Sequence, residues 1–99
     1  MEKRIKVIEF SGESCANCYS LMPILHNILI NYSDVELVHI EVDEEKIDII
    51  SKYQIDRVPT ILILLDEKEV GRCRGYQPEE ILALWLEDKI ENARESRYL

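Results

Sequence analysis

The sequence predicts an α/β fold in which helices flank a four-stranded mixed sheet, in the order β-α-β-α-β-β-α. Two apolar runs of strand length, residues 5–10 and 61–65, fit strands that are covered on both faces. An apolar stripe of helical spacing follows the first run. The link after the second run, DEKE, is too short for a parallel crossover, so it predicts a hairpin. We expect residues 1–99 to form a single domain.

The first strand is predicted over Ile5–Phe10, where one acid, Glu9, interrupts the apolar run. A helix is expected from about Cys15 to Tyr32, with Ser14 as its N-cap. Its apolar face is formed by Leu21, Leu25, Ile28, Leu29 and Tyr32.

The alternating segment Val35–Val42 predicts the second strand. Asp43 follows it and can cap a second helix, residues 44–53. Glu44 and Glu45 fall in the first turn of that helix, where the helix dipole favours negative charge.

The second half of the chain predicts a hairpin and a last helix. Residues 61–65 form one strand, and Val70–Arg74 form its antiparallel partner after a tight turn. Pro78 suits the first turn of the last helix. The packing face of this helix is expected to be Ile81, Leu82, Leu84, Trp85, Leu86 and Ile90. The charged tail, residues 92–99, is expected to fray.

Composition restricts the functional class. With 20 acidic and 12 basic residues the net charge is −8, which disfavours a nucleic-acid partner. The amino-terminal residues contain no apolar run of signal-peptide length, and no stretch is long enough to cross a membrane. We therefore expect a cytoplasmic protein. Three cysteines are too few, and odd in number, for a secreted disulfide scaffold, so a C-x-x-C pair indicates redox or metal chemistry.

The pair is Cys15 and Cys18, at the start of the first predicted helix. Residues three apart on a helix have Cβ atoms about 5–6 Å apart, close to the separation that a disulfide spans. The free N–H groups at a helix start stabilise a thiolate, mainly on the first cysteine. Cys15 is therefore the expected nucleophile, and Cys18 the cysteine that resolves the mixed disulfide.

In the order and spacing of these features the sequence resembles the thioredoxin family over nearly its whole length. The resemblance rests on Glu9 six residues before Cys15, the Cys-Ala-Asn-Cys motif, Pro23 five residues after it, Val42-Asp43, Val58-Pro59-Thr60 and Gly75. It implies a thioredoxin-like fold. Because few residues precede Ile5, we expect the shorter, glutaredoxin-sized version.

The resemblance implies further site residues. Pro59 matches a cis-proline that faces the disulfide, and the backbone of Val58 would pair with an extended substrate chain. Gly75 matches a glycine that leaves space for the substrate, and Pro23 matches a helix-kinking proline. The chain departs from the family's usual Trp-Cys-Gly-Pro-Cys, since Ser14 precedes the motif and Ala-Asn lies inside it. These changes affect redox potential and partner choice.

Glu9 takes the place of the family's buried aspartate, and His39 that of a nearby lysine. We expect Glu9 and His39 to face each other behind Cys18, and burial to raise the pKa of Glu9, which then accepts the proton of Cys18. The alternative is that Glu9 sits at a strand end in contact with water and His39 only tolerates a polar face.

Three other residues have simpler interpretations. Cys73, between two arginines, is expected to be a small apolar residue of the sheet, with a regulatory thiol as the alternative. His26 cannot complete a zinc site with the cysteine pair, because four ligands are needed and no second pair is present. Trp85 belongs to the core.

The predicted function is reduction or exchange of protein disulfides by the Cys15/Cys18 couple, which contributes to cell redox homeostasis. A reductase or a low-molecular-weight thiol such as glutathione would supply the electrons. We expect a monomer without a cofactor or metal. Two alternatives remain open: a binding or adaptor module whose cysteines are slow or structural, and a glutaredoxin-like metal or iron–sulfur carrier.

Overall fold

The computed structural model describes residues 4–95. Its elements are β1 (Ile5–Gly12), α1 (Ala16–Leu29), β2 (Val35–Val42), a 3₁₀ turn (Glu44–Lys46), α2 (Ile47–Tyr53), β3 (Thr60–Leu65), β4 (Lys68–Arg74) and α3 (Glu79–Arg94). The predicted element order is confirmed.

The four strands form one mixed sheet in the order β2-β1-β3-β4. β1 pairs with β2 in parallel, with Ile5 opposite Val35, and with β3 antiparallel. β3 and β4 form the predicted hairpin. Its turn consists of Asp66 and Glu67, both at positive φ, which matches the twist of the two strands. The turn is therefore shorter than expected, and β4 begins at Lys68 instead of Val70.

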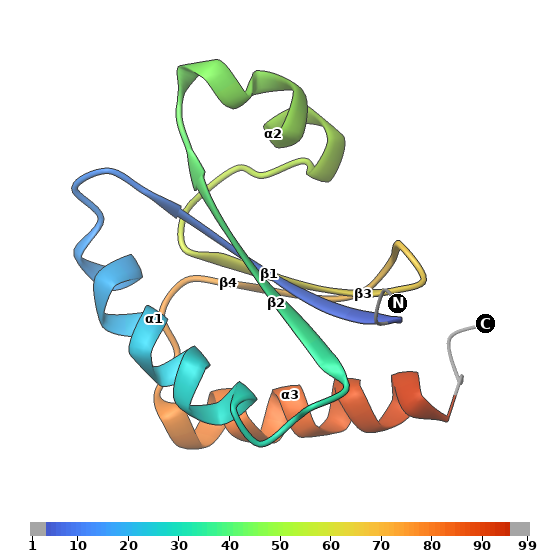
Figure 1. Cartoon of the computed structure of the whole chain (residues 1–99). Coiled ribbons are helices and arrows are strands. Elements are labelled where there is room, and N and C mark those ends of the chain that lie inside the picture. The colour runs from blue at the N-terminus through green and yellow to red at the C-terminus, as the bar shows by residue number, and fades with distance from the viewer. Residues whose placement is uncertain (1–3, 96–99) are drawn as a thin grey trace.

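Figure 1 shows helices on both faces of the sheet, with α1 and α3 on one face and α2 on the other. Side chains alternate between these faces along each strand. On β1, Ile5 and Val7 join the core beneath α1 and α3, whereas Ile8 and Phe10 join the core beneath α2. The sheet is covered on both faces, which explains the apolar runs in β1 and β3.

The start of α1 differs from the prediction. Ser14 is not the N-cap, because it adopts a left-handed conformation with φ 59°. Cys15 takes that position instead, with an extended backbone. The helix also ends at Leu29, three residues before the predicted end. Tyr32 lies beyond the helix but still packs against the core.

The last helix, α3, differs from the prediction at both ends and in which side chains are exposed. Pro78 is the N-cap residue, just outside the first turn. Ile81 and Leu84 were wrongly placed on the packing face, since they are 55% and 69% exposed. Residues 92–94 are helical instead of frayed, because Ala93 is completely buried. Residues 96–99, the rest of the predicted tail, lie outside the described residues.

Candidate active site

Cys15 and Cys18 form a disulfide at the start of α1, with their Cα atoms 5.2 Å apart. The Sγ atom of Cys15 accepts a hydrogen bond of 3.1 Å from the backbone N–H of Cys18. Cys15 is partly exposed, whereas Cys18 is completely buried. Of the two cysteines, only Cys15 is therefore open to the approach of a second molecule. Pro23 lies within α1, which continues through it.

Glu9 is the completely buried acid of β1. It lies directly opposite His39 on the parallel strand β2, and its Oε1 is 3.2 Å from Nδ1 of His39. The Oε2 atom is buried and has no hydrogen-bond partner among residues 4–95. The alternative of a water-exposed Glu9 is therefore wrong, and the two residues do face each other.

Sequence reasoning missed a third member of this group, Ser11. Its Oγ lies 3.2 Å from Nε2 of His39, so both ring nitrogens have a polar neighbour. The signal was present, because Ser11 follows Glu9 by two residues and so shares its face of β1. Recognising it required the register with β2.

The peptide bond between Val58 and Pro59 is cis, as the family resemblance implied. The carbonyl of Pro59 accepts a hydrogen bond of 2.8 Å from the N–H of Gly75, which joins the start of β3 to the end of β4. Thr60 is buried, and its Oγ1 donates to the carbonyl of Arg57 at 2.7 Å. Hydrogen bonds therefore hold the chain on both sides of the cis peptide bond.

Two glycines lie next to the loop that contains the cis-proline, and each is favoured there for a different reason. Gly75 has φ +87°, a conformation that favours glycine, and a Cβ there would meet nothing within 4 Å. Glycine is therefore favoured at this position by its backbone conformation, and its role towards a substrate stays a prediction. At Gly12, a residue the sequence did not single out, a Cβ would lie 3.2 Å from Cγ2 of Val58. Gly12 therefore allows Val58 to approach the end of β1.

These groups meet at one end of the sheet. β1 and β2 run towards this end, β3 begins there and β4 ends there, since β3 is antiparallel to both β1 and β4. The loop to α1 leaves β1 at the same end, on the left of Figure 1. The fold thus brings the loop that carries the disulfide and the loop that contains the cis-proline to the same end of the sheet.

An acidic hollow of about 510 Å³ lies at this end, lined by Glu13, Glu41, Val42, Asp43, Glu44 and Glu45. Glu13 is two residues before Cys15. The negative charge of this region therefore borders the disulfide loop.

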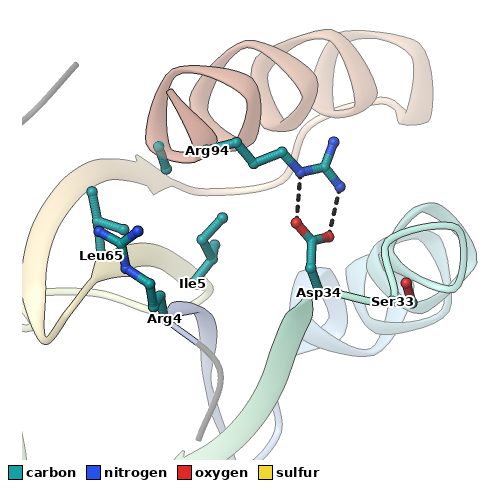
Figure 2. A pocket seen from close by; sticks show the side chains of 7 residues that line it. Arg4, Ile5, Ser33, Asp34, Leu65 and Arg94 are labelled. Carbon is teal, nitrogen blue, oxygen red and sulfur yellow. Dashed lines mark hydrogen bonds and ion pairs between the residues drawn. The ribbon is translucent and has the colours of Figure 1, made fainter. Parts of the chain in front are cut away.

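A second hollow, of about 360 Å³, lies at the opposite end of the sheet (Figure 2). Its charged side chains are paired: Arg94 makes two hydrogen bonds of 2.6 Å with Asp34, and Arg4 pairs with Asp66. These pairs hold the end of α3 to the start of β2 and the start of β1 to the hairpin. We therefore interpret the charged residues of this hollow as structural contacts and not as a binding site.

The remaining singled-out residues lie outside the site. Cys73 is half-buried, and burial raises the pKa of its thiol. The neighbouring arginines bind elsewhere, Arg72 to Glu69 and Arg74 to Asp56, so they do not activate this thiol. Trp85 is partly buried against the core.

Two kinds of feature are absent from residues 4–95. No three His, Cys, Asp or Glu side chains in this range are grouped closely enough to hold a metal ion. No helix in this range is long and apolar enough to span a membrane.

Comparison with known proteins agrees with this geometry. The chain is 27% identical over 91 residues to a thioredoxin of Staphylococcus epidermidis, covering 91% of this chain and 86% of the relative. A thioredoxin of Staphylococcus aureus is 26% identical with the same coverage.

Solved structures of thioredoxins share the fold. A mutant thioredoxin of Halobacterium salinarum superposes with a TM-score of 0.75 at 26% identity, covering 88% of this chain and 75% of that one. Oxidised mitochondrial thioredoxin 3 of Saccharomyces cerevisiae gives 0.77 at 26% identity, covering 88% and 80%. Residues 1–88 match the sequence model of the family described as Thioredoxin. The chain belongs to the thioredoxin family.

Proposed function

We propose that this protein is a thiol–disulfide oxidoreductase that reduces or exchanges disulfides in other proteins. The observation that carries the proposal is the disulfide between partly exposed Cys15 and buried Cys18 at a helix start, in a chain that has the family's cis-proline loop. The whole chain, residues 1–99, is proposed to act as one domain.

Reduced Cys15 is the proposed nucleophile. Its Sγ already accepts the N–H of Cys18, and the same donor would stabilise a thiolate. The thiolate attacks a substrate disulfide, forms a mixed disulfide and releases one substrate thiolate. Cys18 then attacks Sγ of Cys15, so that the second substrate thiolate leaves and the Cys15–Cys18 disulfide forms. Two electrons pass from the protein to the substrate.

Glu9 is the proposed base for the second step. The inward face of α1 passes from Leu25 through Leu21 to Cys18, while the same face of β1 passes from Ile5 through Val7 to Glu9. From this progression we infer that Cys18 lies near Glu9. The free Oε2 of Glu9 is the atom available to accept the thiol proton, while Oε1 is held by His39.

The substrate is proposed to bind along the cis-proline loop. The backbone of Val58 would pair with an extended chain, and the open space at Gly75 would admit it. The acidic hollow beside Glu13 disfavours acidic segments next to the substrate disulfide, because like charges repel. We propose that the protein acts as a monomer in the cytoplasm and is recharged by a reductase or by a thiol such as glutathione.

Reduction of insulin by dithiothreitol, followed as turbidity, tests the proposed activity. The parent and a Cys73→Ser control should accelerate it equally, whereas Cys15→Ser should not. An inactive parent with a stable disulfide would support a binding module instead. A coloured or zinc-loaded preparation would support a metal carrier.

The role of Glu9 needs a separate test, because activity alone does not identify the base. Resolution of a preformed mixed disulfide should be slower in Glu9→Gln, and the pH dependence should change. An unchanged pH profile would remove Glu9 from the mechanism.

A further inference from the structure

Three polar side chains form a chain of contacts on the face of the sheet that packs against α1 and α3. Glu9 Oε1 lies 3.2 Å from Nδ1 of His39, and Nε2 of the same ring lies 3.2 Å from Oγ of Ser11. Glu9 is completely buried and Ser11 is 5% exposed, whereas the His39 side chain is 36% exposed. The ring therefore connects two buried groups to the solvent.

The hydroxyl of Ser11 suits either state of this ring. A neutral imidazole has one donor and one acceptor nitrogen, while imidazolium has two donors. A hydroxyl both donates and accepts, so by rotating it can satisfy Nε2 in each case. Nδ1 can then remain directed at Glu9 when it carries a proton and when it does not.

We propose that Ser11 is a positioning residue that holds the His39 ring against Glu9, so that a proton taken up by Glu9 can leave through His39. This inference rests on the proposed function. The proton comes from the thiol of Cys18, whose sulfur then bonds to that of Cys15 as the substrate thiolate departs. The Glu9 carboxyl first rotates its protonated oxygen towards the ring and passes the proton to an unprotonated Nδ1. The Nε2 proton of the resulting imidazolium then leaves to water when its contact with Ser11 opens. No further oxidant or reductant is needed for this step.

The same connectivity occurs in hydrolases that use a serine nucleophile, but burial argues against that role here. A nucleophilic serine must meet a substrate carbonyl, and Ser11 is 5% exposed within β1. Its hydroxyl is available to His39 and not to a second molecule.

Other groups around the ring can also titrate. Glu41 lies two residues along β2 and is the register partner of Ser11, and Cys18 is a buried residue of α1. On β3, the register partner of Glu9 is Ile61, which is apolar. The buried side chains of α3 are apolar as well. A pH profile therefore has to be compared between variants that leave Glu41 and Cys18 unchanged.

The first test reads the tautomer of His39 directly. The chain has only two histidines, so nitrogen NMR of histidine-labelled protein with a His26→Gln variant assigns the signals. In Ser11→Ala, the Nε2 signal and the balance of tautomers should change. Ser11→Thr should restore them, while Ser11→Val, which has the shape of threonine without the hydroxyl, should behave like alanine. Identical signals in the Thr and Val variants would overturn the proposal, even if the alanine variant does not fold.

The second test is single-turnover resolution of the mixed disulfide between about pH 5.5 and 9. A hydrogen bond worth about 1 kcal/mol corresponds to roughly a fivefold rate change. We expect about that loss in the Ala and Val variants, with an altered pH profile, and recovery to within about twofold in the Thr variant. Equal rates and profiles in the Thr and Val variants would overturn the proposal. If the parent itself reduces no disulfide, the proposed function fails, and the NMR result still decides whether Ser11 positions His39.

Discussion

Gly75→Ala should destabilise the protein through its backbone alone. Gly75 has φ +87°, yet a Cβ there meets no atom within 4 Å, so no steric clash contributes. An L-residue in a left-handed conformation costs about 1–2 kcal/mol. Alanine also lowers the entropy of the unfolded chain, which offsets about 0.4–1 kcal/mol. The net loss in unfolding free energy is therefore about 1 kcal/mol, or roughly 4–8 °C in Tm for a domain of this size.

Gly71→Ala is the matched comparison. Gly71 carries no positive φ, but its Cβ would lie 3.3 Å from Cζ2 of Trp85 and 3.2 Å from Cδ of Lys89. The Gly71 variant should therefore shift the fluorescence of Trp85, the single tryptophan, whereas the Gly75 variant should not. Urea unfolding followed by circular dichroism gives both stabilities.

Two results would refute the reasoning for Gly75. A variant more stable than the parent would mean that the backbone at this position is unstrained, because the lower entropy of the unfolded chain would then act alone. A loss above about 3 kcal/mol would exceed the usual range for one strained residue. It would mean that the methyl group clashes with other atoms, although the structure places none within 4 Å of it.

Three further predictions concern the rest of the molecule. Because burial raises the pKa of Cys73, alkylation of this free thiol in the oxidised protein should be slower at about pH 7.5 than after unfolding, as mass spectrometry would show. The hydrogen bond from Arg72 lowers the pKa of Glu69, so its stabilisation is present above the ordinary carboxyl pKa and lost as pH falls through the lowered value. In thermal unfolding, Glu69→Gln should cost under about 1 kcal/mol at pH 7, and this cost should shrink steadily as the pH is lowered below the ordinary carboxyl pKa. Leu82→Ala should cost about 2–5 kcal/mol in urea unfolding, whereas Leu84→Ala, at an exposed position of the same helix, should cost under about 0.5 kcal/mol.

The order of elements followed from the sequence because each signal was local. The run at residues 61–65 and the short polar link after it determine a strand and a hairpin without reference to the rest of the chain. The cysteine spacing is equally local. The error at the end of α3 concerned a contact over a long distance in sequence. Arg94 pairs with Asp34, sixty residues away, and no local pattern shows that this pair lies at the end of α3.

The surface of α3 was misjudged for a related reason. Its apolar residues are too many for one stripe, and only the sheet and α1 decide which of them are covered. Leu82, Leu86 and Ile90 recur at helical spacing and are buried, whereas Ile81 and Leu84 lie outside that stripe and are exposed. At the start of α1, Ser14 is a residue type that is favoured at the N-cap. Cys15 takes that position instead, because its sulfur accepts the N–H of Cys18.

One row of side chains across the sheet separates Glu9 from the third cysteine. His39, Glu9, Ile61 and Cys73 are successive partners on β2, β1, β3 and β4. Neighbouring strands lie about 4.7–4.9 Å apart, so two steps place the Cα atoms of Glu9 and Cys73 roughly 10 Å apart. Ile61, which is completely buried, stands between them. Ile61 thus separates the Cys73 thiol from the carboxylate, and burial raises the pKa of this thiol, so Cys73 is not a partner for the proton transfer proposed for Glu9.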